Sequence, residues 1–196
     1  MHASLVFNFS RMPETISSGP VEKTRCEKYL DKLLKTSPIV KFLLDALTRS
    51  NCSHPKIQCI PCPSSTQATG TFDPDIGVTL CENWINDGIT AEDTLAHELI
   101  HAFDYCRVKF DKDSCRHNAC SEIRAANLSG DCKFSRELFR GNFSKIVGQH
   151  QRCVKRRAIL SLKSNPACKD CKDVDKLVDE VFAVCFSDTA PFLDIP

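Results

Sequence analysis

The sequence predicts a mainly α fold with a small antiparallel β element, stabilised by disulfides. Apolar residues recur at the three- and four-residue spacing of helices through most of the chain. One region, residues 70–82, instead carries two short runs of β type around a proline-containing turn. The third observation is the cysteine count, thirteen in 196 residues, which exceeds what a reduced domain of this size normally carries.

The length allows one domain with a well-buried core. Residues 1–21 show no sustained period, so we expect a mobile arm there and a single domain over residues 22–196. The arm carries no recognisable signal or transit peptide. The most apolar stretch, residues 39–47, is interrupted by Lys41 and Asp45 and is too short to span a bilayer.

The charge balance gives no electrostatic case for a nucleic acid or an anionic membrane surface. The chain has 26 Lys and Arg against 25 Asp and Glu. It also lacks a P-loop and any interleaving of aromatic and basic residues. We therefore expect no nucleic-acid partner. The short apolar stretch described above also leads us to expect no transmembrane span.

Two helices are predicted first, over residues 22–34 and, after Ser37-Pro38, over residues 38–47. Both are expected in the core, although the wide apolar face of the second leaves a membrane contact open. Residues 51–69 are rich in Pro, Ser and Cys and are predicted to be a loop. The two short strands follow.

The next helix is predicted from Thr90 to Lys109. Thr90 is a good N-cap, and Asp93 three residues later forms a pair of the capping-box type. An apolar stripe follows at helical spacing: Leu95, Leu99, Phe103 and Cys106.

This helix carries the motif His-Glu-Leu-Ile-His at residues 97–101. Residues four apart share a helix face, so His97 and His101 can bind one zinc ion while Glu98 lies beside the open metal position. Asp104 falls on the same face, where its carboxylate could orient a histidine ring. The motif predicts a catalytic zinc site of the peptidase type; two solvent-facing histidines are the alternative.

A catalytic zinc ion usually takes three protein ligands. Glu122, in a helical stretch twenty-one residues after His101, is the candidate for the third. Asp104 and His117 stay open as alternatives, as does an exposed Glu122 paired with Arg124 or Lys133. A third histidine ten residues after His97 is absent, because that position is Arg107.

Residues 76–82, just before the motif helix, are predicted to form an edge strand that pairs with an extended substrate through the region of Val78 and Leu80. A buried hairpin strand is the alternative. Further helices are predicted at about 135–150, 152–163 and 174–186. The group that stabilises the oxyanion stays open among Tyr105, His117 and His150.

The thirteen cysteines allow two arrangements. Cys59 with Cys62, and Cys168 with Cys171, have the spacing of half-sites for a structural zinc ion. The other nine follow no zinc-ribbon pattern, so we favour several disulfides. One cysteine then stays unpaired because the count is odd.

Three blocks of sequence closely resemble one family. They are residues 97–104, residues 119–132 and residues 179–182, the last leading to Cys185-Phe186. The family is that of the mitochondrial inner-membrane metalloproteases that mature and assemble subunit 6 of the ATP synthase, also labelled Ku-binding proteins. The likeness extends over roughly residues 25–196.

The resemblance implies a zincin-like zinc endopeptidase, attached peripherally to the inner membrane on its intermembrane-space side. It implies one catalytic zinc ion held by His97 and His101, with Glu98 as the base; Glu122 rests on spacing alone. It also implies that the substrate is the precursor of ATP synthase subunit 6, and that the protein has a second role as an assembly chaperone. A non-proteolytic chaperone and a Ku-binding adaptor are the alternative functions.

Overall fold

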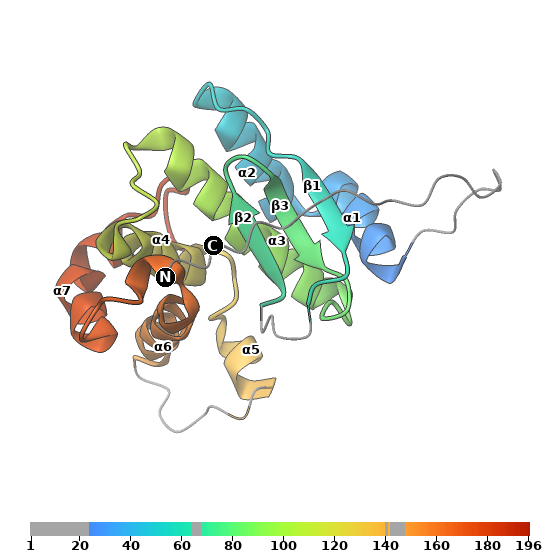
Figure 1. The fold of residues 1–196 in the computed structure, drawn as a ribbon. Helices are drawn as coiled ribbons and strands as arrows, with labels where there is room; N and C mark the ends of the chain where they lie inside the picture. Colours follow the sequence, from blue (N-terminus) through green and yellow to red (C-terminus); the bar gives the residue numbers. More distant parts are fainter. Residues whose placement is uncertain (1–23, 64–67, 140, 142–147) are drawn as a thin grey trace, which may run out of the picture.

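The computed structural model describes residues 24–63, 68–139, 141 and 148–196. The predicted arm over residues 1–21 lies outside this part. The described elements, labelled in Figure 1, are α1 (Arg25–Thr36), α2 (Pro38–Arg49), β1 (Ile57–Ile60), β2 (Gly70–Asp73), β3 (Gly77–Cys81), α3 (Gly88–Arg107), α4 (Cys115–Leu128), α5 (Phe134–Phe139), α6 (Gln149–Ser164), a 3-10 turn (Pro166–Cys168) and α7 (Val174–Ser187). The predicted class, mainly helical with a small sheet, is confirmed.

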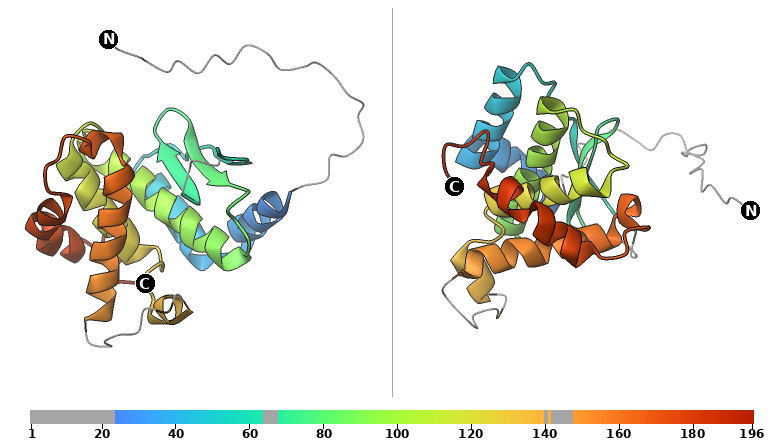
Figure 2. Two further views of the ribbon diagram at one scale, coloured as in Figure 1. Left: turned by 60° about the horizontal axis from the view of Figure 1, so that its bottom comes forward. Right: turned by 90° about the vertical axis from the view of Figure 1, so that its left-hand side faces the viewer.

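Two hydrophobic clusters make up the core. The first joins α1, α2, the sheet and α3; the second joins α4, α6 and α7. Both views of Figure 2 show these groups of elements beside each other. Helix α4 links the clusters, because Ala125 and Leu128 belong to the first and Ala119 and Ile123 to the second. That link supports one domain over residues 22–196, which stays a prediction.

The first two helices begin at strong caps. Thr24 and Glu27 form a reciprocal capping box at α1. Ser37 ends α1 and caps α2, where Pro38 fills the first turn. The wide apolar face of α2 packs into the core through Val40, Leu43, Ala46 and Leu47, so the apolar pattern is explained without a membrane contact. Among the described residues, none of the helices combines the length and hydropathy needed to cross a bilayer.

The sheet has three strands in the order β1-β3-β2. Strands β2 and β3 form the predicted antiparallel pair, and β1 adds a parallel neighbour on the other side of β3. Strand β1 falls inside the predicted loop over residues 51–69, so that part of the loop prediction was wrong and the sheet is mixed. Gly77 has φ +102° and stands where a Cβ would lie 2.2 Å from the carbonyl oxygen of Lys56, which only glycine allows.

The prediction of an edge strand over residues 76–82 was wrong. Strand β3 is hydrogen-bonded on both sides and has no free edge, and Val78 and Leu80 are both 0% exposed. The free edge beside α3 belongs to β2, which packs against that helix.

Helix α3 begins two residues before the predicted start. Asp87 is the N-cap, and its carboxylate accepts hydrogen bonds from the N–H and hydroxyl of Thr90 at 2.8 and 2.9 Å. The hydrogen bond from the N–H of Thr90 lowers the pKa of Asp87 below its ordinary value, as expected for a carboxylate at the start of a helix.

Twelve cysteines form six disulfides, which confirms the preference for disulfides over zinc half-sites. Cys59, Cys62 and Cys168 each form a disulfide with a cysteine outside their own CxxC pair. Cys171 is the free cysteine. The pairs are Cys26–Cys59, Cys52–Cys106, Cys62–Cys81, Cys115–Cys168, Cys120–Cys185 and Cys132–Cys153. Each hydrophobic cluster is therefore cross-linked covalently.

Candidate active site

Three side chains from two helices meet at one point between α3 and α4. The Nε2 atom of His97 lies 3.5 Å from one carboxylate oxygen of Glu122, and the Nε2 atom of His101 lies 3.7 Å from the other. Potential ligand atoms of the three residues all lie within 4.8 Å of one another. Among the described residues, His97, His101 and Glu122 are the cluster of three or more His, Cys, Asp or Glu side chains that could hold a metal ion.

The spacing of these atoms fits a metal ion. Zinc bonds of about 2.0–2.2 Å in a tetrahedral site put neighbouring ligand atoms roughly 3.3–3.6 Å apart. The two nitrogen-to-oxygen distances of 3.5 and 3.7 Å are close to this range. Two imidazoles and one carboxylate are also a ligand set that zinc peptidases use. The alternatives for the third ligand, Asp104 and His117, are not part of the group.

The tautomer of His101 is set by Ser121. The Ser121 hydroxyl donates to Asp104 Oδ2 at 3.1 Å, so its oxygen is left to accept the N–H of His101 Nδ1 at 2.7 Å. The lone pair of His101 then lies on Nε2, which faces Glu122. Asp104 was expected to orient a histidine ring; it lies on the predicted face but reaches His101 only through Ser121.

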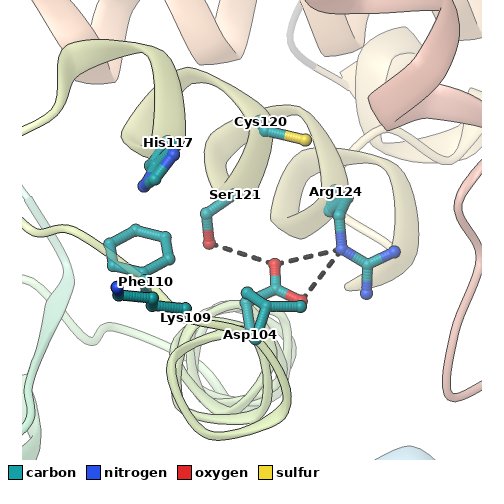
Figure 3. Close-up of a pocket in the computed structure, with 8 residues that line it drawn as sticks. Asp104, Lys109, Phe110, His117, Cys120, Ser121 and Arg124 are labelled. Carbon is teal, nitrogen blue, oxygen red and sulfur yellow. Dashed lines mark hydrogen bonds and ion pairs between the residues drawn. The ribbon is translucent and has the colours of Figure 1, made fainter.

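Two arginines hold Asp104 in place. Arg124, 1% exposed, donates through Nε to both carboxylate oxygens at 2.9 and 3.0 Å; Figure 3 shows these contacts beside Ser121. Arg107 donates to Oδ1 at 3.0 Å. The remaining nitrogens of Arg124 bind the backbone carbonyls of Asp188 and Ala190. The segment after α7 is thus tied to the back of the site.

Glu98 is buried beside the three ligands at 6% exposure. Its pKa is raised to about 7, mainly by burial; His101 opposes the rise, the nearby Glu122 adds to it, and the N–H of Phe72 opposes it. Gly70, which is in strand β2 like Phe72, lies against the site. A Cβ at Gly70 would come within 3.3 Å of the Glu98 side chain and 2.6 Å of the Thr94 side chain. A carboxyl with this pKa can both take and release a proton near neutral pH.

Glu122 is kept ionised by the two histidines. Burial alone would raise the pKa of its carboxyl, but the positive charge of protonated His101 and His97 outweighs burial and lowers the pKa to about 2. In the metal-bound form a metal ion would take the place of those protons. An ionised carboxylate is the form that binds a metal ion.

The three residues considered for oxyanion stabilisation lie in different surroundings. Tyr105 is 40% exposed and packs edge-on against Phe72. His117 accepts the N–H of Asp111 on Nδ1. Both ring nitrogens of His150 are hydrogen-bonded, one to the carbonyl of Cys132 and the other to the side chain of Asn127. These contacts give His150 a structural role and leave neither nitrogen for an oxyanion.

Comparison with known proteins identifies the family. The model of the peptidase M76 family matches residues 24–193. The chain belongs to this family. It is therefore a metallopeptidase, and the match spans every residue of the site described above.

Individual M76 relatives agree with the family match. The chain is 45% identical to a protein of Aspergillus fumigatus and 47% identical to one of Coccidioides immitis, in both cases over 94% of this chain and 78% of the relative. It is 43% identical to a protein of Schizosaccharomyces pombe over 92% of this chain and 98% of the relative. All three are named mitochondrial inner membrane protease atp23. No solved structure matches the chain.

Sequence reasoning did not find the residues that support the ligands. Ser121, Arg124 and Asp188 were not predicted to contribute to the site, because their contacts depend on how α4 and the segment after α7 pack against α3. One signal was available for Ser121, a small polar residue directly before the proposed third ligand.

Proposed function

We propose that the chain is a zinc-dependent endopeptidase in which His97, His101 and Glu122 hold one zinc ion and Glu98 is the general base. One observation carries this proposal. The potential ligand atoms converge within 4.8 Å of one another, and the buried carboxyl of Glu98 lies close enough to interact with both His101 and Glu122.

Zinc bound by these ligands would polarise the scissile carbonyl and lower the pKa of a water molecule. The carboxylate of Glu98 takes the proton of that water and later delivers it to the nitrogen of the leaving amine. The N–H of Phe72 holds this carboxylate. Ser121 keeps His101 in the tautomer that leaves Nε2 available.

Strand β2 is the proposed binding edge for an extended peptide. The carbonyl of Thr69 accepts the N–H of Cys81 at 2.9 Å, so odd-numbered residues of β2 bond to β3. The backbone groups of Gly70 and Phe72 then point away from β3. The N–H of Phe72 is held by Glu98, so the groups offered to a peptide are the N–H and carbonyl of Gly70 and the carbonyl of Phe72. A peptide that pairs with this edge lies beside Glu98, which contacts the same strand.

The proposed location is the intermembrane-space side of the mitochondrial inner membrane, with peripheral attachment. The relatives are named as proteases of that membrane. Six disulfides require a compartment that allows thiol oxidation. The same disulfides weigh against a Ku-binding adaptor in the reducing nucleus.

The proposed substrate is the precursor of ATP synthase subunit 6, as the family resemblance implies. We also carry over a role in ATP synthase assembly that needs the folded protein and not its proton transfer. Glu98→Gln separates the two roles, because it removes the base while it preserves the side-chain volume.

The test uses zinc-loaded protein with its disulfides intact. Glu98→Gln should bind one zinc ion and lose hydrolysis of the subunit 6 precursor, whereas Glu122→Ala should lose zinc as well. Glu180→Gln, on an exposed part of α7, is the control and should keep both. Substantial cleavage by the Glu98 variant would refute the base, and full zinc in the Glu122 variant would refute the third ligand. In cells, failure of a folded, zinc-loaded Glu98→Gln protein to support assembly would refute the separate assembly role.

A further inference from the structure

We propose that a hollow between the end of α3 and the first half of α4 is a specificity pocket that takes one apolar side chain of the peptide substrate. This inference rests on the proposed endopeptidase function and adds a substrate preference to it. The cavity has a volume of about 240 Å³ and is lined by Asp104, Val108, Lys109, Phe110, His117, Cys120, Ser121 and Arg124. Figure 3 shows these residues around the hollow.

The pocket lies next to the proposed metal site. Two of its lining residues, Asp104 and Ser121, belong to the chain of hydrogen bonds that orients His101. Asp104 is three residues after His101 on α3 and Ser121 is the residue before Glu122 on α4. A side chain in the pocket therefore lies within about one helical turn of a ligand on each helix.

A row of rings connects the pocket with the proposed substrate strand. The ring of Phe72 on β2 lies 6.1 Å from that of Tyr105, and Tyr105 lies 6.0 Å from Phe110. Phe110 in turn lies 5.9 Å from His117 in the pocket wall. A peptide paired with β2 would reach the pocket along this row of rings, past the ring of Tyr105, which is 40% exposed.

The chemistry of the wall selects apolar side chains. Val108, Phe110 and the disulfide-bonded Cys120 supply apolar surface. The buried polar groups are already paired, because Asp104 accepts from Ser121, Arg107 and Arg124. A charged substrate side chain would find no free partner among these buried groups, and burying an unpaired charge is costly.

The size also suits a side chain. Cavities that enclose whole small molecules usually measure roughly 300–1,000 Å³, and this one is smaller at about 240 Å³. Two of its lining residues, Val108 and Phe110, can be substituted without changing the metal ligands or the residues that hold them. Val108 is 48% exposed, so Val108→Trp should narrow the pocket, and Phe110→Ala should enlarge it.

The experiment compares side-chain preference between variants. Zinc-loaded wild-type protein and both variants digest a positional-scanning peptide library, and mass spectrometry identifies the cleaved bonds. In parallel, fluorescence anisotropy measures the binding of peptides that carry Leu, Phe, Gly, Asp or Lys at the selected position to zinc-loaded Glu98→Gln protein, with and without the pocket changes. Val184→Trp, at a position 74% exposed on α7, is the matched control.

We expect wild type to favour Leu or Phe over Gly and Asp by about tenfold or more at one position. Val108→Trp should remove that preference and leave peptides with Gly there unaffected, while Phe110→Ala should move it toward larger side chains. An apolar preference that survives both changes would overturn the pocket, as would a preference for Asp, which would point to Lys109 at the rim. Absence of hydrolysis by wild type counts against the proposed function, and the binding measurements still decide the pocket.

Discussion

Replacing Glu98 by Gln should stabilise the metal-free protein at alkaline pH. The carboxyl of Glu98 is 6% exposed, and its pKa rises from 4.5 to about 7 because burial disfavours the charged form. Glutamine has nearly the same shape and no charge. Its amide oxygen can still accept the N–H of Phe72, so the variant removes mainly the cost of burying a carboxylate.

The magnitude follows from the difference between the two pKa values. A rise from 4.5 to about 7 corresponds to about 3 kcal/mol. Between these pH values the folded state binds more protons than the unfolded state, so the free energy of unfolding falls as pH rises. Below pH 4.5 both states are protonated and the cost is absent; above about pH 7 the full cost is present.

Glu122 acts in the opposite direction and at lower pH. Its pKa is lowered to about 2, so its stabilising contribution is present above pH 4.5 and is lost as pH falls toward 2. Measurements at pH 5 and pH 8 both lie above the range in which Glu122 takes up a proton, and comparing variant with wild type at the same pH removes contributions that the two proteins share.

The assay is guanidinium unfolding with a chelator and without reductant. At pH 8 the Glu98→Gln variant should be about 3 kcal/mol more stable than wild type, equivalent to roughly 6–12 °C in Tm. At pH 5 the two should differ by less than about 1 kcal/mol, and Glu180→Gln should match wild type at both. A variant that is less stable at pH 8, or a difference independent of pH, would refute the reasoning.

Two further predictions concern the residues behind the ligands. Ser121→Ala removes the acceptor of His101 Nδ1 and should weaken zinc binding about 10–100-fold, measured by competition with a chelator, while Ser121→Thr should restore most of it; unchanged affinity in the alanine variant would contradict the role of Ser121. Arg124→Ala deprives buried Asp104 of its closest partner and should cost about 3–5 kcal/mol of unfolding free energy, measured in guanidinium. A loss below about 1 kcal/mol would show that Arg107 alone is a sufficient partner.

The sequence could predict the elements whose signals are local. The helix with His97 and His101 is predicted by its apolar stripe and by histidines four residues apart. Its observed range differs from the predicted one by two residues at each end. Its true cap, Asp87, was missed because Thr90 is an equally good cap by residue type. The β2–β3 hairpin was likewise visible from its turn residues.

Features that depend on distant contacts could not be predicted in this way. Strand β1 lies among prolines and cysteines, and it becomes a strand by pairing with β3 some twenty residues later. Missing it made β3 look like an edge and misplaced the binding strand onto Val78 and Leu80. The contact of Ser121 with His101 likewise arises only when α4 packs on α3.

The central claim is that His97, His101 and Glu122 hold one zinc ion, and zinc-edge X-ray absorption on protein purified without reductant tests it most directly. We predict one zinc per chain with two imidazole nitrogens and oxygen ligands, all at about 2.0–2.2 Å. Sulfur neighbours at about 2.3 Å, or a spectrum unchanged when Glu122 is replaced by alanine, would contradict the claim.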